Sequence, residues 1–314
     1  MDVLARRMLE RFNKAKTDRV MFEGLFEECF EYALPMRQSF FHESSGQRRD
    51  DKIFDETAVV GTQEFASRLQ SGLVPNFARW ADFIAGSEVP KEEEDEVNNS
   101  LDEVTEYVFE IIQNSNFGQE VHESFMDLAV GTGVLLVEEG DAINPVRFNA
   151  IPLPSVYLDT GADDKIDHVY RQRTLKYSDL PVAYPKAVFQ ERTAKAIVSQ
   201  PDSKVKLVEI VCRNYEKPNE DKFDFYVINI PEEEMIAQEQ FTGVGSNPYV
   251  CFRWSKASGE IYGRGPLINA LSAIKTTNLT IELVLENAQM AISGIYQMDD
   301  DGIINTDTIN LVPG

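Results

Sequence analysis

The residue types that most often carry chemistry are few in this sequence, and their spacing forms no known catalytic or metal site. The three histidines, His42, His122 and His168, lie far apart, outside any HExxH pair or close His/Cys cluster, so a zinc site is not expected. The sequence contains no Gly-x-Ser-x-Gly elbow of a serine hydrolase and no Gly-x4-Gly-Lys-Ser/Thr phosphate loop. We therefore predict no catalytic residue, no cofactor and no bound metal.

Two weaker patterns have simpler explanations. The Gly-Thr-Gly at 131–133 stands between a predicted helix and a predicted strand, which reverses the strand-to-helix order of a dinucleotide site, so we interpret it as a turn. The carboxylates at 50–51 and 299–301 have the chemistry to hold a divalent cation. Acidic turns are common on protein surfaces, and an acidic hydrolase with an unrecognised site remains an alternative function.

The basic residues near position 50 are the other candidates for chemistry. Arg48, Arg49 and Lys52 have the charge to contact phosphates, but four acidic residues lie between positions 50 and 56. These carboxylates would cancel most of the positive field and favour ion pairing. Salt bridges within the chain or between subunits are the favoured interpretation, and nucleic-acid contact is the alternative.

Acidic residues dominate the charge. The chain carries 53 Asp and Glu against 30 Lys and Arg, a net charge of −23, which argues against a DNA-binding module because such modules use Lys and Arg to replace counterions. Residues 1–79 carry 12 basic and 13 acidic residues, whereas residues 81–146 carry one basic and 17 acidic. That acidic segment is either a solvated surface that confers solubility or a wall that repels a polyanion.

The composition is that of a folded protein in water. The 314 residues are 43% hydrophobic and 26% charged, which is typical of globular chains with one large or two ordinary domains. No apolar run has the length of a secretory signal or a membrane span. The three cysteines lie far apart, so we expect buried thiols in a reducing compartment.

The elements that must position these residues follow from the apolar periodicity. Spacing of the helical kind predicts a short helix around Leu4–Phe12 and a second over Phe22–Ala33. Asp55 is expected to cap a helix that ends at Leu73. Two more helices are predicted at about 92–116 and 117–130, and a strand at 78–86.

From residue 131 the apolar period changes to two, and turn residues become frequent. Helices first and strands after predict an α+β fold, with one or two short helices near 183–190 and 191–200. The seven predicted strands are 133–141, 146–153, 155–160, 165–175, 204–214, 221–230 and 247–255.

A long helix is predicted from Pro266 to about Ala291, because Gly265 and Pro266 mark its start. It would be about 39 Å long. One stripe of residues recurs at steps of four and three and forms the seam of a packed helix pair, so the helix needs a partner in this chain or in other copies. The seam residues are Leu267, Leu271, Ile274, Asn278, Ile281, Leu285, Ala288 and Ile292, and the charged residues are Lys275, Glu282 and Glu286.

Three stretches in a fixed order carry a resemblance to a known family. They are YALPMRQSFF (32–41), DKIFDETAVVGTQEFASRLQSGLVP (51–75) with ARW after it, and the FRW…YGRGP…AL..IK..N region (252–278). Together they resemble the head-to-tail connector, or portal, proteins of short-tailed, podovirus-type bacteriophages. The matching positions are Tyr32, Pro35, Arg37, Phe41, Asp55, Phe65, Arg68, Gly72, Pro75, Arg79, Trp80, Tyr262, Gly263, Arg264 and Pro266.

The resemblance implies a ring of about twelve copies at one capsid vertex, a passive channel for packaging and ejection of double-stranded DNA. It implies a wing over 1–265, helical over 1–130 and β-rich over 131–265, then a first stem helix over 266–292 and the beginning of a clip over 293–314. The rest of the clip, a second stem helix and a crown are expected to be missing. Twelve copies would carry −276, from −23 each, so DNA would be repelled and would slide.

The implied partners are further copies of the chain, the major capsid and scaffolding proteins, the terminase packaging motor, tail or adaptor proteins, and DNA in transit. The implied location is the virion, after assembly in the host cytoplasm, with no enzymatic activity. A capsid-associated adaptor of another kind is the alternative. The candidate channel or subunit-interface residues are Lys275, Asn278, Glu282, Glu286, Arg37, Arg48, Arg49, Lys52, Asp55, Arg68, Arg79 and Arg264.

Overall fold

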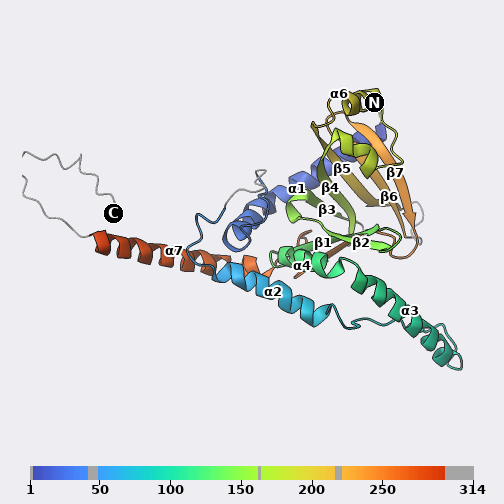
Figure 1. Ribbon diagram of the computed structural model, residues 1–314, viewed down its shortest axis with the longest axis horizontal. Helices are drawn as coiled ribbons and strands as arrows, with labels where there is room; N and C mark the ends of the chain where they lie inside the picture. Colours follow the sequence, from blue (N-terminus) through green and yellow to red (C-terminus); the bar gives the residue numbers. More distant parts are fainter. Residues whose placement is uncertain (1–2, 42–48, 162–163, 216–220, 294–314) are drawn as a thin grey trace, which may run out of the picture.

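The computed structural model describes residues 3–41, 49–161, 164–215 and 221–293 (Figure 1). Helices fill most of its first part and antiparallel strands most of the rest, so the predicted α+β class is confirmed. Of the helices that it describes, none combines the length and apolar character that a bilayer crossing demands. The helices are α1 (Val3–Ala33), α2 (Thr57–Leu73), α3 (Glu94–Asn114), α4 (Phe117–Leu128), α5 (Leu180–Ala183), α6 (Glu191–Ser199) and α7 (Pro266–Ser293).

The strands form two antiparallel sheets. The three-stranded sheet has the order β2-β1-β8 and the five-stranded sheet the order β3-β4-β5-β6-β7. All seven predicted strands are present, and β7 was missed because its sequence, with two glutamates and two glutamines among nine residues, shows no clear apolar alternation. The strands are β1 (Thr132–Glu139), β2 (Val146–Ala150), β3 (Val156–Thr160), β4 (Ile166–Lys176), β5 (Lys204–Arg213), β6 (Lys222–Asn229), β7 (Glu234–Thr242) and β8 (Tyr249–Arg253).

Helix α1 corrects the prediction of two separate helices, because it runs unbroken for 31 residues. The polar stretch between the two predicted helices contains Arg19, whose side chain is buried, with only 1% of the residue exposed. Its guanidinium donates hydrogen bonds of 2.8–3.0 Å to the carbonyl oxygens of Leu153, Pro154 and Val156, and pairs with Glu23. The apparent break is therefore the point where α1 is fastened to the start of β3.

The segment 78–86 was predicted as a strand, and that prediction is wrong. It is extended but belongs to neither sheet. Side chains of α3 take the place of a neighbouring strand: the Phe83 amide donates to Thr105 Oγ1 at 3.2 Å and the Ala85 amide to Asn98 Oδ1 at 2.8 Å. A helix that supplies side-chain acceptors thus satisfies backbone groups that a sheet would otherwise pair.

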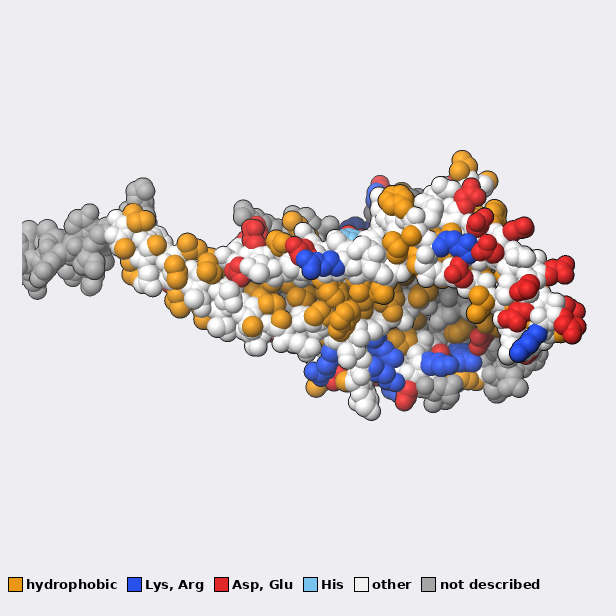
Figure 2. All heavy atoms as spheres, turned by 90° about the horizontal axis from the view of Figure 1, so that it is seen from below, with side chains coloured by type: hydrophobic (Ala, Val, Ile, Leu, Met, Phe, Trp, Pro, Cys, Tyr) orange, Lys and Arg blue, Asp and Glu red, His pale blue; other side chains and the backbone are white. Residues whose placement is uncertain are grey.

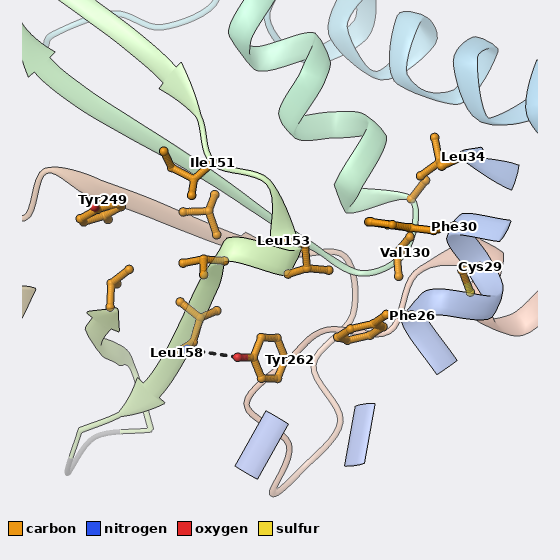
Figure 3. Close-up of a cluster of buried hydrophobic side chains, with 14 of the residues drawn as sticks. Phe26, Cys29, Phe30, Leu34, Val130, Ile151, Leu153, Leu158, Tyr249 and Tyr262 are labelled. Atoms are coloured by element: carbon orange, nitrogen blue, oxygen red, sulfur yellow. Dashed lines mark hydrogen bonds between the residues drawn. The ribbon is translucent and has the colours of Figure 1, made fainter. Parts of the chain in front are cut away.

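The main core lies where α1 meets the start of β3 and both sheets (Figure 3). Phe26 and Phe30 of α1 pack there with Leu153, Leu158 and Tyr262. The Leu158 amide donates to the Tyr262 hydroxyl at 3.1 Å, so the buried phenol is satisfied as burial requires. This contact ties the strand edge to the segment that leads into α7.

That segment crosses the end of α4 at very short range. Gly131, with φ of +152°, lies against Gly263, and a Cβ at Gly131 would meet the Gly263 carbonyl oxygen at 2.1 Å. A Cβ at Gly265 would meet the Ala129 carbonyl oxygen at 2.1 Å. The Gly265 amide donates to the Val130 carbonyl oxygen at 2.8 Å. Gly131 therefore lies in the predicted turn between α4 and β1 and also at a close crossing with the segment that leads into α7.

Replacing Arg19 with methionine should destabilise the fold strongly. Arg19→Met leaves the partly buried Glu23 without its partner and three carbonyl oxygens without their donor, a loss on the order of 3 kcal/mol. Arg68→Met is the matched control, because Arg68 also pairs with a glutamate four residues away but is 81% exposed, and it should cost at most about 1 kcal/mol. Urea unfolding measures both, and equal losses would refute the role given to Arg19.

Candidate functional site

The residues that could do chemistry are engaged in structural contacts. Within the described residues, no group of three or more His, Cys, Asp or Glu is placed to hold a metal ion. His122 contacts Gln70, and His168 contacts Arg11. Burial raises the pKa of the Cys29 thiol to about 12, which leaves it protonated and unreactive. The absence of an active site stays a prediction, and the carboxylates at 299–301 lie outside the described residues.

The best candidate site is a surface, and it centres on α7. The first half of this helix is held by its own chain: Leu267 and Leu271 are buried against the main core, with Ile274 partly buried beside them. Lys275 Nζ lies 3.2 Å from Glu28 Oε2 of α1. These contacts fix the direction in which α7 leaves the body.

Asn278 ends the held half of α7 and joins it to the segment before α2. Its Oδ1 accepts hydrogen bonds from the amides of Phe54 and Asp55 at 2.8 and 3.1 Å, and its Nδ2 donates to the Lys52 carbonyl oxygen at 2.8 Å. The side chain is 6% exposed and has used its hydrogen-bonding groups inside the chain. Asn278 therefore joins α7 to the segment before α2 within the chain, and its place at a channel or subunit interface stays a prediction.

Beyond Asn278 the helix projects from the body, and the residues that the structure describes leave it largely uncovered (Figure 1). Large apolar side chains are exposed there; Leu285, for example, is 53% exposed. An exposed run of this kind marks an interaction surface. The projecting face consists of Leu279, Ile281, Leu283, Val284, Leu285, Met290 and Ile292.

The projecting face continues as apolar surface on the body. Figure 2 shows orange side chains scattered along α7 and a broader orange area in the middle of the molecule, where Figure 1 places α2. Exposed apolar residues on α2 are Val60 and Leu73, and beside α2 lies Trp254, whose ring packs edge-on to Phe65 at 5.2 Å. The candidate site thus consists of the projecting face on α7 and the exposed apolar residues of α2 and Trp254 on the body.

The basic residues before α2 pair within the chain. Arg49 donates to Glu27 Oε1 at 2.6 Å and to the Arg37 carbonyl oxygen at 2.9 Å. Lys52 pairs with Glu31, and this partner raises the pKa of Lys52. The predicted ion pairs are therefore present within the chain, and they hold the segment before α2 against α1. Arg48 lies outside the described residues.

Arg37 holds the end of α1 against α4. Its Nη1 pairs with Glu123 at 2.6 Å, and its Nε lies 3.1 Å from Asp127 Oδ1. No hydrogen bond of good geometry reaches that oxygen, whereas Oδ2 accepts one from the Leu153 amide at 3.0 Å. Burial raises the pKa of Asp127 to about 6, although Arg37 opposes the shift.

The other predicted site residues are not brought together. Arg68 pairs with Glu64, Arg264 with Glu260, and Arg79 with Asp82 and Asp102. Asp55 Oδ1 accepts hydrogen bonds from the Thr57 amide and hydroxyl, so it supports the start of α2 from one position before the capping residue. The remaining two, Glu282 and Glu286, lie on the projecting part of α7.

The sequence interpretation missed half of the projecting face. The seam followed a single stripe, so Leu279, Leu283, Val284 and Met290 were left out. The scarcity of charge on α7 was the available signal, because a helix that is apolar on several sides needs more than one neighbour. Arg19 was also missed, since nothing in its local sequence distinguishes it from a solvated arginine.

The comparisons with known proteins point to one family. The family model described as bacteriophage head to tail connecting protein matches residues 5–314. A probable portal protein of Bordetella phage BPP-1 is 21% identical over 279 residues, which cover 85% of this chain and 50% of that relative. The chain therefore spans about half the length of the curated relative that it matches.

Removing the Asn278 side chain should free the segment before α2. In Asn278→Ala the amides of Phe54 and Asp55 lose their acceptor, at a cost of about 1–3 kcal/mol. Hydrogen exchange at these two amides should accelerate at least about tenfold, as read by mass spectrometry. Thr277→Ala, one residue earlier and exposed, is the control and should leave both rates unchanged.

Asp127 should make the protein less stable as the pH rises from about 4 to 6. Because its pKa in the folded state is about 6, above its ordinary value of 3.8, the folded state binds the proton more tightly than the unfolded chain does. Asp127→Asn should remove this decline, as measured by denaturant unfolding across that range. Asp141→Asn is the control of opposite sign, because backbone amides lower the pKa of Asp141.

Proposed function

Because the chain belongs to the bacteriophage head to tail connecting protein family, we propose that it is a subunit of a portal ring at one capsid vertex. In this proposal the ring has about twelve copies, is built in the host cytoplasm and becomes part of the virion. It is a passive conduit for double-stranded DNA and a docking site for the packaging motor and tail. The observation that carries the proposal is the projecting half of α7.

Six of the seven exposed apolar residues of that half fall into two stripes, and the seventh, Val284, lies between them. Successive residues of an α-helix are rotated by about 100°, so Leu279, Leu283 and Met290 gather within about 40° of one another. Ile281, Leu285 and Ile292 gather on nearly the opposite side, again within about 40°. A helix with two opposite apolar stripes is suited to one neighbour on each side.

Two neighbours for every helix is the arrangement of a closed ring. In a ring each copy presents one surface to the next copy and a different surface to the previous one. A two-fold dimer instead uses one surface twice and would leave the second stripe in water. Burying one leucine is worth about 1.5–3 kcal/mol, so both stripes favour assembly over exposure.

The charged residues of α7 support the same arrangement. Lys275, Glu282 and Glu286 lie on one edge between the two stripes, within about 40° of one another. The opposite edge carries uncharged residues such as Thr276, Thr280 and Asn287. With both stripes covered, one of these two edges faces the bore. Either edge leaves DNA free to slide, because neither offers a row of cations to bind phosphates.

Native mass measurement of the full-length protein tests the proposal, and a closed ring near twelve copies is the expected result. A charge on either stripe should prevent assembly, so both Leu283→Glu and Leu285→Glu should yield monomers whose unfolding is unchanged, because both side chains are exposed. Val20→Glu is the control and should still assemble, because Val20 is 56% exposed on α1 and lies outside the two stripes of α7.

The outcomes separate the candidate assemblies. Loss of assembly in only one stripe variant would replace the ring by a two-fold dimer. A full-length protein that stays monomeric would overturn the portal assignment for this chain. Nucleotide hydrolysis by the purified ring would contradict a passive conduit.

A further inference from the structure

A groove on the body collects positive charge on a chain that is otherwise acidic. It lies between α1, the residues after α1 and the strands β4 and β5, and has a volume of about 570 Å³. Four basic residues line it against a single acid, Glu23. We call it the basic groove, and its basic residues are Lys16, Arg19, Lys204 and Lys206.

Three of these cations form no ion pair with the part of the chain that the structure describes. Arg19 already pairs with Glu23, whereas no ion pair reaches Lys16, Lys204 or Lys206 from any residue that the structure describes. Lys204 also lies directly across from Lys176 on β4, and like charges at such positions repel. Asp202 forms an ion pair with Lys176, at 3.1 Å, but not with Lys204. The groove is therefore set to receive an anionic group from outside the chain.

The chain carries a matching anionic element far from the groove. The stretch 92–96 at the start of α3 is five consecutive acids, all exposed. None of them forms an ion pair with another described residue. Helix α3 projects from the body, with only Thr105 and Phe109 of its residues buried (Figure 1). Figure 2 shows the corresponding red cluster at the end of the molecule opposite α7.

We propose that the acidic start of α3 of one copy docks in the basic groove of the next copy around the ring. This inference rests on the proposed ring, because a ring contact joins two different surfaces of the same chain. The groove and the acidic start are two such surfaces with opposite charge. Opposite charges bring partners together and fix their register. The contact would act alongside the apolar stripes of α7.

A second copy fits the groove better than a nucleic acid does. Only three free lysines face the groove, and the whole chain carries a net charge of −23, so a long polyanion would be repelled by the surroundings. A short acidic segment can pair with the three lysines. Unlike a long polyanion, it brings no further negative charge close to the acidic residues elsewhere on the chain.

Zero-length crosslinking of the full-length ring tests the contact directly. A carbodiimide joins a lysine to a carboxylate only when the two already touch. A ring assembled from equal parts of ¹⁵N-labelled and unlabelled protein should give mixed-label peptides that link Lys204 or Lys206 to residues 92–96. The absence of such peptides from an intact ring would overturn the inference and leave the proposed ring standing.

Charge reversal supplies the second test. Lys204→Glu with Lys206→Glu should slow ring formation at low salt by about tenfold, and so should Glu93→Lys with Glu94→Lys. Combining the four changes should restore the rate, because the charges match again. Lys165→Glu with Lys256→Glu is the control, since both lysines are exposed and lie outside the groove.

The remaining outcomes count against the inference or against the ring. A combined variant as slow as either double variant would overturn the docking. So would binding of duplex DNA or inorganic phosphate that is lost on reversing Lys204 and Lys206. Failure of the unaltered full-length protein to form any ring would instead refute the proposed function.

Discussion

The close crossing of two glycine-bearing segments determines how the rest of the molecule is used. Gly131 and Gly263 meet at a distance that admits no side chain, and Gly265 lies equally close to the end of α4. Backbone hydrogen bonds from Gly265 and Leu267 to the residues at the end of α4 complete the joint. Because the joint places Pro266 at the surface of the body, α7 leaves the fold early. The described part of the chain then leaves about half of its length uncovered.

Helix α1 gives that joint a rigid support. Its first half packs against the five-stranded sheet, and Arg19 in its middle binds three carbonyl oxygens at the start of β3. Its second half carries Glu27, Glu28 and Glu31, which hold the segment before α2 and the first half of α7. One continuous helix therefore connects the five-stranded sheet, the segment before α2 and α7. A force applied to α7 would be transmitted to the five-stranded sheet through α1.

Sequence patterns predicted elements well where local chemistry decides the structure. Gly265 and Pro266 marked the start of α7, and alternation located seven strands. The patterns failed where distant partners decide. Arg19 looks like a solvated residue until the carbonyl oxygens of residues 153–156 are placed around it, and 78–86 looks like a strand until Asn98 and Thr105 satisfy its amides. The sequence predicted that the basic residues near position 50 form ion pairs, but it did not identify their partners on α1.

The positions of the acidic residues bear on two interpretations that the composition left open, a solvated surface and a wall that repels a polyanion. Most acids of the segment 81–146 lie on α3 and α4, and α3 projects at the end of the molecule opposite α7 (Figure 1). If α7 lines a bore, the acids at the projecting start of α3 lie far beyond the screening length of about 8 Å at physiological salt and cannot repel DNA inside it. Repulsion within the bore would then depend on the few carboxylates of α7 itself. In the proposed ring, the acids at the start of α3 would instead orient one copy against the next.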